Sequence, residues 1–292
     1  MRFDNKKKKI MKTNWQKLNN ISLTKLVETR KQLHQAVQLS ALTGRAFLPK
    51  VDDDHFASLL WNKEKDVLSG QAWGKDNYKT ALNFKEFSIL LLDKNNETIN
   101  SFSLNEISYN NAFKKLKEMV ELTGEDADKL STSLPYEIPV YPTATNENFN
   151  FFEKIYFEEL GKYFANANLV LKNVVKNNPE ASEIGCWPHH FDIATLLVLN
   201  DNKDNYKSVG VGLSPGDDNY DQPYFYITPW PYPNIDAITL PDLPSSSFWH
   251  TEGWVGAILT AENILNFNSA EEQHNAVNKF IDIGIKENKD LM

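Results

Sequence analysis

The stretch LPYEIPVYPTATN, residues 134–146, divides the sequence into two parts. It holds three prolines within eight positions. Each proline fixes φ and removes the N–H donor that a helix needs, so we expect an extended connector here. We therefore expect an N-terminal half over residues 21–133 and a C-terminal half over residues 147–292, which can also pack as one compact domain.

The first half has the pattern of a helix, then antiparallel strands, then a second helix. Ser22 can cap an amphipathic helix that ends near Gly44. Three extended segments follow, HFASLLWN (55–62), FKEFSILLLD (84–93) and ETINSFSLNEI (97–107), with DKNNE as the turn between the last two. Ser108 can cap the second helix, which ends near Gly124.

The second half repeats this order of elements. An aromatic helix runs from Phe149 towards Val174, and a capping box of Ser269 and Glu272 opens the last helix. Between them we expect four strands, CWPHHFDIATLLVL (186–199), SVGVGLS (208–214), QPYFYITPW (222–230) and SFWHTEGWVGAIL (247–259). The order predicts an α+β fold of two similar halves, each with helices packed on a mixed or antiparallel sheet.

Composition narrows the class of protein. The formal net charge of −8 argues against a nucleic-acid partner, which would need clustered Lys and Arg. The sequence contains no apolar run of about 18 residues, so we expect no membrane span. Residues 1–20 are expected to be a basic, disordered tail, since no apolar segment of a secretory signal follows its lysines. The single cysteine, Cys186, fits a reducing compartment, and we expect a cytoplasmic protein.

The start of the strand 186–199 brings two histidines together. Side chains alternate between the faces of a strand, so Trp187, His189 and Phe191 should face the core. His190 and Asp192 should share the opposite face. We therefore expect His189 to be structural and His190 with Asp192 to be the candidate catalytic pair, in which Asp192 orients a general acid or base.

The stretch FWHTEGW would place His250, Glu252 and Trp254 on one face in the same way. If the two strands are neighbours, His190 and Asp192 would meet His250 and Glu252. Imidazole and carboxylate ligands suit a divalent metal such as zinc, manganese or iron. The alternative is that each histidine pairs with its nearby carboxylate and only stabilises the fold.

Aromatic side chains form a second cluster. Tyr224, Tyr226 and Trp230 should share one face of the strand 222–230, near Trp254. Aromatic rings with polar tips can form the wall of a ligand pocket. They can equally fill the core of a sheet.

Arg45 lies among apolar residues, so its charged guanidinium needs a polar or acidic partner. It can form an ion pair with the acidic run Asp52, Asp53 and Asp54 just beyond it. Otherwise its guanidinium can hold a carboxylate or phosphate of a ligand through two parallel hydrogen bonds.

Two groups of residues resemble the bacterial family called domain of unknown function 5996. The matching residues are Leu33, His34, Gln38, Gly44, Arg45, Pro49 and His55, followed by Trp187, Phe191, Asp192, Ile193 and Ala194. The chain departs from the family's pattern in having one more residue after the tryptophan, and histidines in place of Gly-Ser. The resemblance implies the layout of elements and no activity, cofactor or catalytic residue.

These patterns predict that the protein binds a small polar ligand. The pocket would have His190, Asp192, His250 and Glu252 as its floor and Tyr224, Tyr226, Trp230 and Trp254 as its walls, with Arg45 as a further ligand-binding residue. A metal-dependent hydrolase that uses the same floor residues is the first alternative. A protein-interaction module that exposes the aromatic segment PYFYITPWPYP (223–233) is the second.

Overall fold

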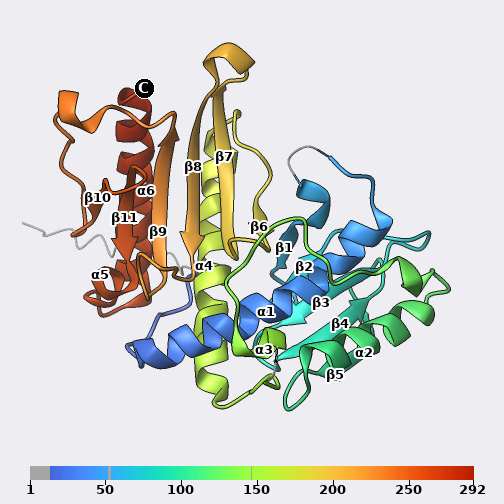
Figure 1. Ribbon diagram of the computed structural model, residues 1–292. Coiled ribbons are helices and arrows are strands. Elements are labelled where there is room, and N and C mark those ends of the chain that lie inside the picture. The colour runs from blue at the N-terminus through green and yellow to red at the C-terminus, as the bar shows by residue number, and fades with distance from the viewer. Residues whose placement is uncertain (1–13, 52–53, 146) are drawn as a thin grey trace, which may run out of the picture.

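The computed structural model describes residues 14–51, 54–145 and 147–292. In these residues six α-helices accompany eleven strands, which form one antiparallel sheet (Figure 1). The strand order is β10-β11-β9-β8-β7-β6-β1-β2-β3-β4-β5. The predicted α+β class is confirmed.

The helices are α1 (Leu23–Phe47), α2 (Tyr109–Glu121), α3 (Pro142–Thr145), α4 (Lys154–Asn177), α5 (Ala261–Leu265) and α6 (Ala270–Asp290). The strands are β1 (Leu59–Asn62), β2 (Val67–Gly70), β3 (Lys79–Asn83), β4 (Ser88–Leu92), β5 (Thr98–Ser103), β6 (Gly185–Trp187), β7 (Asp192–Asn200), β8 (Lys207–Ser214), β9 (Tyr224–Trp230), β10 (Phe248–His250) and β11 (Gly256–Thr260). Strands from both sides of the connector thus share one sheet, joined where Leu59 of β1 lies opposite Cys186 of β6.

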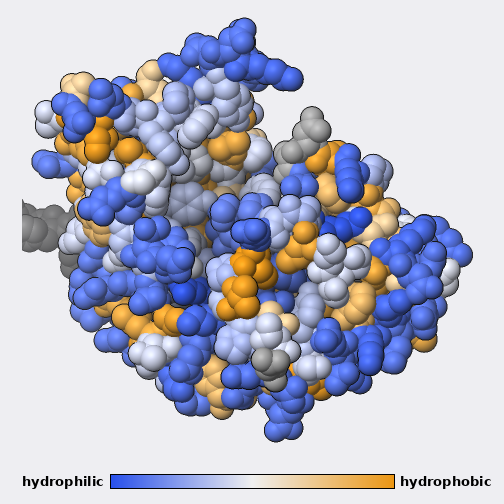
Figure 2. Space-filling model, in the orientation of Figure 1, coloured by the Kyte–Doolittle hydropathy of each residue, from blue (hydrophilic) through white to orange (hydrophobic). Residues whose placement is uncertain are grey.

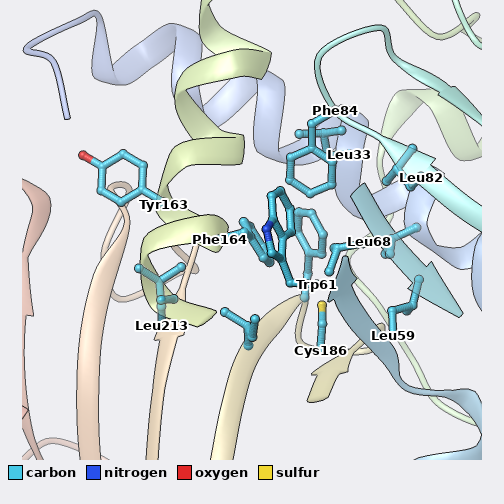
Figure 3. Close-up of a cluster of buried hydrophobic side chains, with 14 of the residues drawn as sticks. Leu33, Leu59, Trp61, Leu68, Leu82, Phe84, Tyr163, Phe164, Cys186 and Leu213 are labelled. Carbon is cyan, nitrogen blue, oxygen red and sulfur yellow. The ribbon is translucent and has the colours of Figure 1, made fainter. Parts of the chain in front are cut away.

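The helices α1, α4 and α6 pack on the sheet around one large aromatic and aliphatic core. Figure 3 shows Trp61 beside Phe84 and Phe164, and the ring centroids lie 5.9 and 6.3 Å from that of Trp61. Cys186 belongs to the same cluster, and burial raises the pKa of its thiol. The thiol is therefore an inert core group, as expected of a buried cysteine.

The segment 186–199 is a hairpin, so its prediction as one strand is wrong. β6 ends at Trp187, a turn covers residues 188–191, and β7 begins at Asp192. Pro188 has no N–H to continue a strand ladder, and Phe191 adopts a left-handed φ of 55°. Trp187 lies opposite Asp192 and therefore shares its face.

The segment 247–259 is also a hairpin, in which residues 251–255 join β10 to β11. Gly253 adopts a φ of 81°, which a glycine reaches without steric cost. The expected strand alternation of His250, Glu252 and Trp254 is therefore wrong, because only His250 lies in a strand.

Two other predictions need correction. The connector is extended only as far as Tyr141, and Pro142 then opens the short helix α3, where its missing N–H costs nothing.

Of the expected tail, residues 1–13 lie outside the described residues, but Trp15 and Leu18 are buried in the core. The side-chain oxygen of Gln273 accepts hydrogen bonds from Trp15 Nε1 and Leu18 N.

Within the described ranges, no helix has the length and apolar character needed to cross a membrane.

Phe164 should contribute strongly to stability, because it is fully buried between Trp61 and Phe84. We expect Phe164→Ala to lower the free energy of unfolding by about 3–5 kcal/mol in urea titrations. The matched control is Ile155→Ala at the exposed start of the same helix, which should cost less than about 0.5 kcal/mol. Equal costs would contradict this account of the core.

Candidate functional site

One side of the strands β7, β8 and β9 forms a cleft. Figure 1 shows α4 and α6 behind these strands, and the side that faces the viewer carries no helix along most of its length in the described residues. Figure 2 shows this side hollowed at the centre of the molecule. In β8, Val209, Val211 and Leu213 point to the core, so Gly210 and Gly212 lie on the cleft side.

A tyrosine–carboxylate pair lies in this cleft. Tyr226 of β9 is opposite Gly212 of β8, which is opposite Ala194 of β7. A Cβ atom on Gly212 would lie only 2.7 Å from Tyr226 Cζ, so the glycine lets the ring cross the strand. The Tyr226 hydroxyl then donates a hydrogen bond of 2.5 Å to Asp192 Oδ2.

Both groups lie at the bottom of a recess. Burial raises the pKa of the Asp192 carboxyl, and the hydrogen bond from Tyr226 opposes that shift in part. Burial and the neighbouring Asp192 raise the pKa of Tyr226 well above its ordinary value. Each side chain nevertheless stays partly exposed. Side chains on the floor of a cleft are expected to be surrounded by many protein atoms and yet to keep some contact with solvent, as Asp192 and Tyr226 do.

Aromatic groups line one side of the cleft in a continuous chain of contacts. Tyr224 donates to Asp217 Oδ2, and the ring of Tyr220 lies 5.0 Å from that of Tyr224. The Tyr220 hydroxyl lies 2.8 Å from His250 Nδ1. The His250 ring is in turn 4.4 Å from that of Trp254. Tyr224 lies beside Tyr226, with 6.3 Å between the ring centroids, so this chain reaches the Asp192 pair.

The four predicted metal ligands do not come together. His250 Nε2 lies 2.8 Å from the Glu252 carbonyl oxygen, which can only accept, so Nε2 is the donor and Nδ1 accepts from Tyr220. Glu252 thus contributes its carbonyl, and its side chain is exposed. His190 is exposed in the turn, against the ring of His189. Across the described ranges no three His, Cys, Asp or Glu side chains are placed to hold a metal ion.

A second polar cluster, the His34 clamp, lies next to the cleft. We define it as His34 and Gln38 of α1, Pro188 of the hairpin turn, and Tyr136 and Tyr141 of the connector. The Pro188 carbonyl accepts from Gln38 Nε2 at 2.6 Å and lies 3.0 Å from His34 Nε2. His34 Nε2 must therefore carry the hydrogen, and Nδ1 accepts from the Tyr141 hydroxyl at 2.8 Å.

Tyr136 links this clamp to the histidines of the turn. Its hydroxyl donates to Gln38 Oε1 at 2.8 Å, and its ring lies 5.1 Å from the ring of His189. Burial lowers the pKa of His189 to about 4, and the neighbouring His190 adds to this shift. His189 is thus partly buried and His190 is exposed, and both lie in a turn rather than on opposite faces of a strand.

Two predicted ligand-binding residues lie away from Asp192. The Arg45 guanidinium stacks over the ring of Tyr136 at 4.6 Å. Of its expected partners, Asp52 and Asp53 lie outside the described residues, and Asp54 forms no ion pair with it. Trp230 is exposed at the other end of β9 and packs on Tyr232.

Sequence reasoning missed several residues of this region. Asp217 and Tyr220 lie in the loop between β8 and β9, and neither was among the predicted site residues. Arg30, His34 and Gln38 did carry a signal, because a spacing of four places them on one face of α1. All three side chains are buried, which marks a polar stripe within the core.

Comparison of the chain with family models, curated proteins and solved structures gives no match. The resemblance to domain of unknown function 5996 therefore stays a prediction. Two of the residues that carry it are far apart in sequence but adjacent in space. The rings of His34 and Phe191 stack with 5.5 Å between their centroids.

The His34 clamp should make stability depend on pH. Burial, aided by the charge of Arg30, lowers the pKa of His34 to about 4 from 6.5. The unfolded chain then binds a proton before the fold does, so this stability is complete above pH 6.5 and is lost as pH falls towards 4. His34→Gln should therefore lose about 2 kcal/mol less than the wild type between pH 7 and pH 4.5 in urea titrations. An unchanged pH dependence would contradict a neutral, clamped His34.

Gly212 should be needed for the tyrosine–carboxylate pair. We expect Gly212→Ala to displace the Tyr226 ring and to cost about 1–3 kcal/mol of unfolding free energy. Gly210→Ala is the matched control on the same strand and face, because its Cβ would only approach Thr228 Cγ2, at 3.2 Å. Urea titrations of both variants test the difference, and equal costs would show that Tyr226 does not depend on the glycine.

Proposed function

We propose that the protein binds a small polar ligand in the cleft, with Asp192 on its floor. The observation that carries this proposal is the unequal state of the two carboxylate oxygens. Oδ2 accepts from Tyr226, whereas Oδ1 is buried and has no hydrogen-bond partner among the described residues. A buried acceptor without a partner is costly, and an N–H or O–H group of a ligand would satisfy it.

The surroundings of Asp192 indicate which ligand would fit. The rings of Tyr220, Tyr224 and Trp254 provide an aromatic side for the apolar part of a ligand. A ligand amine, amide or hydroxyl would donate to Oδ1, which is sealed in this structure and would become accessible through a shift of the Asp192 side chain on binding. Because its pKa is raised, Asp192 is also suited to exchange a proton with such a group. Its hydrogen-bonded partner would be Tyr226 rather than the expected His190.

The cleft favours this function over the two alternatives. A metal-dependent hydrolase would need His190 and His250 in one cluster, which the described residues do not form. An interaction module is supported only by the exposure of Trp230 and Tyr232, which lie apart from the polar residues. The ligand-binding proposal accounts for the unpartnered carboxylate oxygen.

We further propose that the two parts of the chain are similar units of helix, antiparallel strands and helix. The series α1, β1–β5 and α2 would correspond to α4, β6–β11 and α6. We also propose a cytoplasmic location, supported by a single cysteine that is buried in the core.

Calorimetric titration tests the role of Asp192. A panel of small primary amines, amides and polyols is first screened by thermal shift, and each hit is then titrated. Asp192→Asn should weaken a hit at least about tenfold, which corresponds to about 1.4 kcal/mol. Tyr226→Phe should have a smaller effect, because it frees Oδ2 but leaves Oδ1.

The matched control is Asp204→Asn, which makes the same chemical change at an exposed turn and should bind as the wild type does. A panel without hits, or hits that bind Asp192→Asn with unchanged affinity, would refute the proposal. Circular dichroism of each variant establishes that the fold is retained.

A further inference from the structure

Arg30 of α1 is a buried cation without a partner. Its side chain is only 7% exposed, and Nη1 is sealed from solvent with no hydrogen bond. Among the described residues, Arg30 forms no ion pair, and Nη1 forms no hydrogen bond even though the Tyr220 and Gln222 carbonyl oxygens also lie near Gly216. Nε and Nη2 are not among the sealed, unpaired atoms, so the guanidinium keeps some contact with solvent.

The guanidinium lies against the loop between β8 and β9. A Cβ atom on Gly216 would lie 2.3 Å from Arg30 Nη1, and Gly216 has a φ of 111° that favours glycine. The opposite side is formed by the clamp residues Tyr141 and His34. Burial raises the pKa of Tyr141 and the charge of Arg30 opposes that rise, which places the guanidinium close to this hydroxyl.

None of the titratable groups near Arg30 forms an ion pair with it among the described residues. His34 is neutral, because its Nδ1 accepts from Tyr141. The Asp217 carboxylate accepts from Tyr224, and Asp218 is exposed on the loop, where its charge reaches Tyr141 but forms no ion pair with Arg30. A buried charge whose partner is missing is strongly destabilising, so a guanidinium in this setting calls for an anion.

We propose that Arg30 binds the oxyanion group of a small molecule, a carboxylate or a phosphate, where α1, the β8–β9 loop and Tyr141 meet. The planar guanidinium fork matches two oxygens of such a group through parallel hydrogen bonds. The Tyr141 hydroxyl remains committed to His34 and supplies one wall of the site. This site is independent of the Asp192 proposal, because it uses none of the same side chains.

Thermal unfolding in different anions tests the site. Wild-type protein is melted in sodium phosphate, sodium acetate and sodium chloride at matched ionic strength. Phosphate or acetate should raise the Tm above the value in chloride, since an anion that binds only the folded state stabilises it. The anion with the larger effect distinguishes a phosphate site from a carboxylate site.

Variants of Arg30 show whether the effect arises at this residue. Arg30→Met should abolish the oxyanion-dependent rise in Tm and, in chloride, should melt no lower than the wild type, because it removes an unpaired buried charge. Arg30→Lys keeps the charge but loses the fork, and should weaken oxyanion binding at least tenfold in calorimetry. Lys31→Met is the matched control, an equal loss of charge at an exposed neighbour, and should respond as the wild type does.

Three outcomes would overturn the proposal. One is an equal Tm of the wild type in all three salts, and another is an undiminished oxyanion response in Arg30→Met. The third is a large fall in the Tm of both Arg30→Met and Arg30→Lys in chloride, which would make the guanidinium a structural group. Asp192→Asn should keep the full oxyanion response, so the two proposals fail separately.

Discussion

The carbonyl oxygen of Pro188 joins three distant segments of the chain. It accepts hydrogen bonds from His34 and Gln38 of α1, and these two side chains hold the connector through Tyr141 and Tyr136. All of these bonds lie in or at the edge of the core, where an unmade hydrogen bond is costly. The position of the β6–β7 turn relative to α1 therefore depends on this one acceptor.

The geometry of the cleft follows from that constraint. The clamped turn ends at Phe191, whose ring is fixed between His34 and the aromatic core. Asp192 is the next residue, so its carboxylate is directed to the cleft side of the sheet and meets Tyr226 across Gly212. Helix packing on one side of the sheet thus positions the polar groups on the other.

Local rules predicted local features well. Ser22, Ser108 and Ser269 cap helices as expected, and the alternation of β9 places Phe225 and Ile227 in the core and Tyr224 and Tyr226 on the other face. The predictions of single strands over 186–199 and 247–259 were wrong, because each segment contains a hairpin turn that strand alternation cannot detect. β2 and β3 were missed because their apolar runs are short and lie among turn residues.

The sequence by itself determined the α+β class, the serine caps of three helices and the residue types from which a polar site can be built, whereas α1 runs past Gly44 to Phe47 and α4 begins only at Lys154. Only the tertiary structure decided which of those residues meet. It separated His190 from His250, joined His250 to Tyr220, and left Arg30 and Asp192 with atoms that no described residue satisfies. The reason is physical: propensity and periodicity depend on neighbours along the chain. Whether a buried charge has a partner depends instead on segments that are far apart in sequence and are brought together by the core.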